Sequence, residues 1–182
     1  MHFGLKNIND NKVKNMSVAN LSNAKNSTTI ADAEKKIPQT VAISYGAAKT
    51  VCGAAENTIV TKVIDGDTVV VEGGYHVRLL GIDADEKGYP CYDQAKTRLE
   101  DLILAKQVAL EKDKTDVDQY GRCLRYIFVN GKNVDVQLVG EGLAVARFYQ
   151  PNVKYRSEIA EAEKQAQQNK VGCKWSGAQQ EK

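Results

Sequence analysis

The stretch VIDGDTVVV, residues 63–71, has the pattern of a β-hairpin whose two halves meet at one glycine. β-branched residues dominate both halves, and Asp-Gly is a strong turn signal. A single aspartate would be enough to form the turn, yet Asp65 and Asp67 both flank Gly66. The stretch therefore predicts a hairpin, together with one carboxylate that the turn does not need.

Further strand patterns lie on both sides of this hairpin. Gly-Asp, Gly-Gly and single glycines separate the first three of them, which predicts three consecutive antiparallel strands. A fourth run alternates apolar and polar residues, and a fifth ends at Asn130-Gly131, a strong turn signal. The five predicted strands are NTIVTKVID (57–65), TVVVEGG (68–74), YHVRLLGID (75–83), KQVALEKD (106–113) and RCLRYIFV (122–129).

Three segments have the apolar spacing of helices: residues 92–104, residues 134–144 and a last one near residues 155–169. These helices do not alternate with every strand, so a parallel α/β sheet is a poor fit. The pattern predicts an α+β fold, a five-stranded Greek-key β-barrel of the OB-fold type with about three α-helices.

At 182 residues and 42% hydrophobic content, the chain is long enough for one domain and a tail. Residues 1–56 are rich in Asn, Lys and Ser and predict a flexible N-terminal tail and linker. The folded domain is expected at residues 57–178, with a C-terminal tail at 179–182. No apolar run is long enough to span a membrane, so no membrane association is expected.

The charge of the predicted domain is almost balanced, with 18 basic and 19 acidic side chains in residues 57–182. A near-neutral domain cannot hold a polyanion through its overall field. Binding to nucleic acid would therefore require local clusters of Arg and Lys, or a bound cation.

Four widely spaced cysteines, without a C-x-x-C pair, argue against a structural zinc site. They form either two disulfides or four thiols, and full pairing allows three connectivities. Cys123 lies in an apolar run, where a buried free thiol is an equally good interpretation. Pairing would favour a secreted or cell-surface protein, and free thiols a cytoplasmic one. The four are Cys52, Cys91, Cys123 and Cys173.

Acidic residues stand at the ends of two predicted strands. Asp65 and Asp67 surround the first turn, and Asp83 and Glu86 follow RLLG. Carboxylates that converge repel one another, which favours proton sharing or a bound divalent cation such as calcium. Taken one at a time, each of these residues is better explained as a turn residue or a solvated loop residue, and only the set favours a bound cation.

Two arginines complement these carboxylates. Arg78 lies inside the apolar strand YHVRLLG, where a guanidinium needs a partner or a site to line. Arg122 follows DQYG at the start of the fifth strand. Together they could make forked bonds to one phosphate, although structural pairing of each with a carboxylate is the alternative.

Four segments in this order and spacing resemble the thermonuclease or staphylococcal nuclease-like (SNase-like) family. The resemblance extends from about Ile59 to Trp175 and independently implies the five-stranded OB barrel. The segments are IDGDT (64–68), VRLLGIDADE (77–86), DQYGRCLRYIFVNGK (118–132) and LVGEGLAVAR (138–147).

The resemblance implies a calcium-dependent endonuclease, a hydrolase that cleaves DNA and RNA with little sequence preference and leaves 3′-phosphates. Single-stranded substrates and a monomeric protein are expected. Calcium would be held by three aspartates with the Ala84 carbonyl, Glu86 would act as general base, two arginines would grip the scissile phosphate and two tyrosines would contact the substrate. These three aspartates are Asp65, Asp67 and Asp83, the two arginines are Arg78 and Arg122, and the two tyrosines are Tyr120 and Tyr149.

The chain departs from the family pattern at three positions. Asp85 stands in place of a proline, where it could raise the pKa of Glu86 or become an outer metal ligand. Gln119 replaces a lysine and Arg147 replaces a tyrosine. The alternative function is a non-catalytic SNase-like module that binds nucleic acid or protein, but such a module needs none of the carboxylates that this chain keeps.

Overall fold

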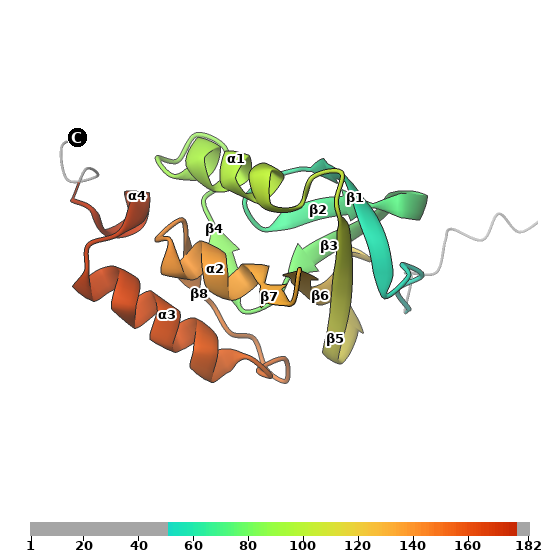
Figure 1. The fold of residues 1–182 in the computed structure, drawn as a ribbon. Helices are drawn as coiled ribbons and strands as arrows, with labels where there is room; N and C mark the ends of the chain where they lie inside the picture. Colours follow the sequence, from blue (N-terminus) through green and yellow to red (C-terminus); the bar gives the residue numbers. More distant parts are fainter. Residues whose placement is uncertain (1–50, 178–182) are drawn as a thin grey trace, which may run out of the picture. The chain divides into compact units, whose positions relative to one another are not determined.

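The computed structural model describes residues 51–177, and five of its strands close into a barrel (Figure 1). The sheet runs in the order β3-β2-β1-β5-β6-β7, and parallel pairing of β3 with β6 closes it. The predicted OB-type α+β barrel is therefore confirmed. The barrel strands are β1 (Asn57–Val63), β2 (Thr68–Val71), β3 (Tyr75–Leu79), β5 (Gln107–Val117) and β6 (Cys123–Val129).

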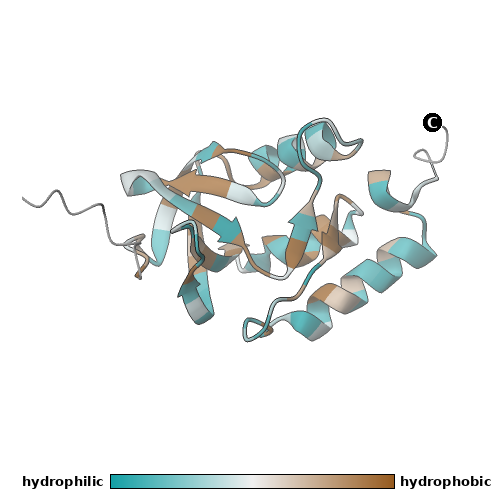
Figure 2. Cartoon of the chain, turned by 180° about the vertical axis from the view of Figure 1, so that it is seen from behind, coloured by the Kyte–Doolittle hydropathy of each residue, from teal (hydrophilic) through white to brown (hydrophobic). Residues whose placement is uncertain are grey.

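Alternation of side chains along the strands fills the barrel interior. In the first hairpin, Val63 of β1 pairs with Val69 of β2, and both are buried. Val77 on β3 and Tyr126 on β6 are fully buried as well. Seen from behind, apolar segments interrupt the polar ones along the strands (Figure 2). The β-branched runs form strands because every second side chain can enter this core.

The predicted third strand, residues 75–83, is split in two. β3 ends at Leu79, Gly81 has a φ of +78°, and β4 (Ile82–Ala84) pairs with β8 (Ala144–Ala146) in a separate two-stranded sheet. The fourth strand is longer than predicted, since β5 continues to Val117 instead of ending at Asp113. The split matters because β4 carries Asp83 beside the barrel instead of within it.

Helices cover one end and one side of the barrel (Figure 1). α2 contacts β6 and packs against α3, whereas α1 contacts β1. Asn133 caps α2 by accepting hydrogen bonds from the backbone N–H groups of Asp135 and Val136. None of the helices in residues 51–177 is long and apolar enough to cross a membrane. The remaining elements are η1 (Glu72–Gly74), α1 (Tyr92–Ile103), β7 (Lys132–Asn133), α2 (Val134–Gly140), α3 (Arg156–Gln168) and α4 (Gly172–Trp175).

Two disulfides use all four cysteines, Cys52–Cys123 and Cys91–Cys173. The interpretation of Cys123 as a buried free thiol is therefore wrong. Most of the predicted N-terminal tail and the whole C-terminal tail lie outside the described residues. Within the part of that first stretch that is described, Cys52 joins the chain to the start of β6.

Candidate functional site

The turn between β1 and β2 is pressed against β4 and α1. A Cβ on Gly66 would lie 2.6 Å from the Cβ of Ala84 and 2.7 Å from the Cβ of Ala95. Such separations are too short for real side chains, so only glycine fits. Gly66 is required by this close approach and not by a positive φ. The approach places the turn that carries Asp65 and Asp67 against β4, the strand that carries Asp83.

Arg78 on β3 connects two of these aspartates. Its Nη2 lies 3.0 Å from Oδ2 of Asp67 and 3.1 Å from Oδ1 of Asp83. Its Nη1 donates to the carbonyls of Leu79 and Ile82, which turns the guanidinium toward the gap where β3 ends and β4 begins. Both carboxylates therefore converge on a single positive group, as their positions at the strand ends predict.

Asp67 is the most buried of the three aspartates. The backbone N–H of Ala84 donates to its Oδ2 at 2.8 Å, and the Thr68 hydroxyl donates to its Oδ1 at 3.0 Å. Burial raises the pKa of the Asp67 carboxyl to about 6, although the Arg78 guanidinium acts to lower it. Asp65 instead accepts a hydrogen bond from the backbone N–H of Asp67 at 3.0 Å, which is ordinary turn chemistry.

Carboxylate and carbonyl oxygens are the ligands that calcium prefers, and this donor set consists only of oxygens. As the side chains stand, no three His, Cys, Asp or Glu residues within 51–177 are grouped closely enough to hold a metal ion. Arg78 supplies the positive charge between Asp67 and Asp83 in this arrangement. The donor chemistry fits calcium, and the ligand set of Asp65, Asp67 and Asp83 stays a prediction.

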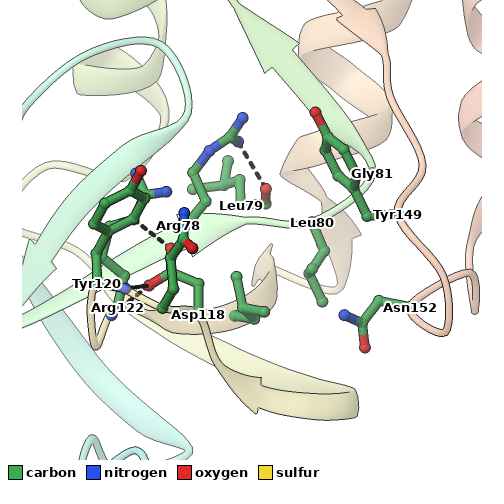
Figure 3. Close-up of a pocket in the computed structure, with 11 residues that line it drawn as sticks. Arg78, Leu79, Leu80, Gly81, Asp118, Tyr120, Arg122, Tyr149 and Asn152 are labelled. Atoms are coloured by element: carbon green, nitrogen blue, oxygen red, sulfur yellow. Dashed lines mark hydrogen bonds and ion pairs between the residues drawn. The ribbon is translucent and has the colours of Figure 1, made fainter. Parts of the chain in front are cut away.

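A cavity of about 550 Å³ opens beside Arg78 (Figure 3). Arg122 lines the same cavity, as do the two predicted substrate tyrosines, Tyr120 and Tyr149. The tyrosines stand on opposite sides of it, with Arg78 between them. The two residues are 75% and 66% exposed, which is unusual for tyrosines and leaves much of each ring accessible to a ligand.

Asp118 holds Arg122 in the cavity wall. Its Oδ2 accepts from Nε of Arg122 at 2.7 Å, and its Oδ1 accepts from the backbone N–H groups of Tyr120 and Arg122. The guanidinium lies 5.5 Å from the centre of the Tyr120 ring. Arg122 is therefore both paired with a carboxylate and part of the cavity wall, and the same holds for Arg78.

Asn152 holds the segment that carries Tyr149. It is buried, and its Oδ1 accepts hydrogen bonds from the backbone N–H groups of Lys114 and Thr115 on β5. Its own N–H donates to the carbonyl of Tyr149 at 3.0 Å. Sequence reasoning missed this residue because no local pattern distinguishes a buried, hydrogen-bonded Asn from a loop Asn.

Glu86 makes no hydrogen bond or ion pair with the other predicted site residues in the described part of the chain. Glu86 lies two residues beyond β4, is exposed and does not line the cavity. Within residues 51–177 its carboxylate accepts no hydrogen bond and forms no ion pair; only its carbonyl accepts, from the N–H of Tyr89. Asp85 forms an ion pair with Lys174 and accepts a hydrogen bond from the backbone N–H of Cys91, so its carboxylate has partners within the protein.

Arg147 adds a third guanidinium near the site. Its Nε lies 3.5 Å from Oδ2 of Asp83, whose other oxygen contacts Arg78. Its backbone N–H donates to the carbonyl of Gly81, a residue of the cavity wall. The side chain is 55% exposed. The sequence singled out Arg147 only as a departure from the family pattern.

Comparison with known proteins shows the family to which the chain belongs. Residues 76–176 match the sequence model of the family described as staphylococcal nuclease homologue. The thermonuclease of Staphylococcus intermedius is 38% identical over 125 residues, which cover 64% of this chain and 74% of that protein. Endonuclease YncB of Bacillus subtilis is 38% identical over 131 residues, 66% of this chain and 62% of that protein. The chain belongs to the family of staphylococcal nuclease homologues.

Proposed function

We propose that this protein is a calcium-dependent nuclease that hydrolyses phosphodiester bonds of DNA and RNA and leaves 3′-phosphates. The relatives that carry the names thermonuclease and endonuclease support a phosphodiester hydrolase. The observation that carries the proposal is the shared cavity. Arg78 and Arg122 line one space between two exposed tyrosines, beside a pair of carboxylates.

The two arginines are suited to grip one phosphate. Of the three guanidinium nitrogens of Arg122, Asp118 engages only Nε, and no hydrogen bond within residues 51–177 uses the two terminal nitrogens. These nitrogens can make a forked, charge-assisted contact to phosphate oxygens. Arg78 lines the cavity and also pairs with Asp67 and Asp83. Both guanidiniums would stabilise the negative charge that grows on the phosphoryl group during attack.

Asp65, Asp67 and Asp83 would hold the calcium ion, with the Ala84 carbonyl as a further ligand. Bound calcium would supply positive charge next to the scissile phosphate. The buried Asp67 carboxylate has the strongest need for such a countercharge, because burial already raises its pKa to about 6. Arg78 contacts both Asp67 and Asp83, so it would link the metal ligands to the phosphate.

Glu86 would accept the proton of the attacking water. The water oxygen forms a bond to phosphorus while the bond from phosphorus to the 5′-oxygen breaks; the 5′-oxygen keeps the electron pair and takes a proton from solvent to become a 5′-hydroxyl, and the phosphate stays on the 3′-oxygen. A general base needs to reach the water but not the phosphate itself, which suits a side chain outside the cavity wall. The exposed Glu86 carboxylate has no partner in the described part of the chain that would compete for the proton.

Single-stranded polymers are the proposed substrates. Tyr120 and Tyr149 expose their rings on either side of the cavity, and unpaired bases can stack on such rings without regard to sequence. Arginine contacts to phosphate add affinity without sequence information. We propose that the protein acts as a monomer in an oxidising, extracytoplasmic location, since both of its disulfides would be unstable in a reducing cytoplasm.

A direct assay tests the proposal. Single-stranded DNA, duplex DNA and RNA are incubated with the protein in calcium, magnesium or chelator, and the product ends are mapped. We expect cleavage in calcium, none in chelator, and 3′-phosphate ends. Glu86→Gln should lower kcat by a factor of about 100 or more, in the range of a lost general base. Binding to the polymers without cleavage in any divalent ion would instead identify a non-catalytic SNase-like module.

A further inference from the structure

The segment between β4 and α1 is exposed in its middle and anchored at both ends. Residues 86–90 are all exposed. Asp85 precedes this segment and Cys91 follows it, and Oδ2 of Asp85 accepts a hydrogen bond from the backbone N–H of Cys91 at 3.0 Å. The two ends of the segment are therefore bonded to each other, and Glu86 is the first residue inside the loop that they close.

Both ends are also bonded to the same short helix near the C-terminus. Cys91 forms a disulfide with Cys173, and Asp85 forms an ion pair with Lys174. The side chains of this ion pair are only 16% and 15% exposed, so solvent screens it less than it screens a surface pair. Two neighbouring residues of α4 thus hold the two residues that flank the loop.

α4 is itself packed closely against the segment that follows α2. The backbone N–H of Lys174 donates to the carbonyl of Gly142 at 3.0 Å. A Cβ on Gly142 would lie 2.0 Å from the carbonyl oxygen of Val171, so the two chain segments touch backbone to backbone. Gly142 lies between α2 and β8, and β8 pairs with β4. The anchor is therefore connected to the strand that carries Asp83.

We propose that Asp85, Lys174 and the Cys91–Cys173 disulfide form a latch that positions Glu86 for the reaction. This inference rests on the proposed function, in which Glu86 is the general base. Glu86 has no side-chain partner of its own within residues 51–177, so its position depends on the loop that carries it. Fixing both ends of a five-residue segment lowers its conformational entropy and restricts where Glu86 can lie. The latch also accounts for the aspartate at position 85.

The test separates positioning from simple stability. Asp85→Asn keeps an oxygen that can accept from Cys91 but loses the charge that pairs with Lys174. We expect kcat to fall between about 10-fold and 100-fold, as for a misplaced catalytic group. The dissociation constant for single-stranded DNA, measured in chelator, should stay unchanged because no phosphate contact is lost. Amide hydrogen exchange of residues 86–89 should become faster.

A matched control exists in the pair Arg98–Glu141, which has two hydrogen bonds of 2.7 Å and lies outside the loop. Arg98→Gln should lower the melting temperature and leave kcat unchanged. The Cys91→Ser/Cys173→Ser variant should repeat the effect of Asp85→Asn with the other disulfide intact. In a Glu86→Gln background, Asp85→Asn should cause no further loss of kcat, because the residue on which the latch acts is already gone.

Three results would overturn the latch. They are an unchanged kcat in Asp85→Asn, an equal loss of kcat with and without Glu86, or a loss of kcat in Arg98→Gln as large as in Asp85→Asn. Failure of the proposed function looks different. If Glu86→Gln is as active as the natural protein, the general-base role itself is wrong, whatever the exchange rates of residues 86–89 show.

Discussion

The carboxyl group of Asp135 should make the stability of this protein fall as pH rises. Asp135 lies in the first turn of α2 and is completely buried. Its Oδ2 accepts from the backbone N–H of Ile127 at 3.0 Å, and its Oδ1 has no partner among the described residues. Burial raises the pKa of Asp135 from 3.8 to about 8. A carboxyl in this position keeps its proton at neutral pH.

The sign follows from proton binding in the two states. Between about pH 4 and pH 8 the folded protein holds the Asp135 proton and the unfolded chain does not, so each unit of rising pH lowers the free energy of unfolding by about 1.4 kcal/mol. The contribution is fully present below pH 4 and is lost by about pH 8. Asp135→Asn removes this dependence, because an amide does not titrate and still accepts from Ile127.

Urea unfolding followed by circular dichroism, on oxidised protein, measures the effect. Relative to Asp135→Asn, the natural protein should lose about 3 kcal/mol of unfolding free energy between pH 5 and pH 7. Asp67 titrates in part of this window, with a pKa of about 6, but it is common to both proteins. The exposed Asp101→Asn serves as the control and should follow the natural profile. Parallel profiles for the natural protein and Asp135→Asn would refute the reasoning.

Three more predictions concern the site and its supports. Anisotropy titrations in chelator give the binding constant K for single-stranded DNA at several salt concentrations. Arg147→Gln should reduce the magnitude of the slope of log K against log salt by about 0.7, which corresponds to the loss of one phosphate contact. Lys164→Gln, which makes the same charge change on α3, should leave the slope unchanged. Gly66→Ala should lower the free energy of unfolding by about 1–3 kcal/mol, since its Cβ would overlap Ala84, and a melting temperature equal to the natural one would contradict this. Asn152→Ala should weaken DNA binding in the same titration, because two N–H groups of β5 lose the acceptor that holds the Tyr149 segment; unchanged affinity would remove Asn152 from the site.

Much of the barrel could be predicted from local patterns in the sequence. Strand propensity and alternation depend on neighbours in the chain, so the five strands and the three longer helices could be predicted. The break in the third strand could not, because Leu79 and Ile82 are both buried and apolar while their backbones pair with different sheets. A run of apolar residues does not indicate the sheet with which the backbone of each residue pairs.

For the site, the sequence by itself predicted which residues would carry the chemistry. Asp65 and Asp67 put two carboxylates at one turn, and Asp83 and Arg78 are charged residues in an apolar strand pattern, all of which is visible without a structure. Tertiary structure alone decided the partners: which cysteines pair, that Asp85 meets Lys174, that Gly66 is required by Ala84, and that Asp135 is buried without a partner for one oxygen. The physical reason is sequence distance, since Asp85 and Lys174 are 89 residues apart. Contacts over such distances are selected by the packing of the whole domain, and no short stretch of sequence contains them.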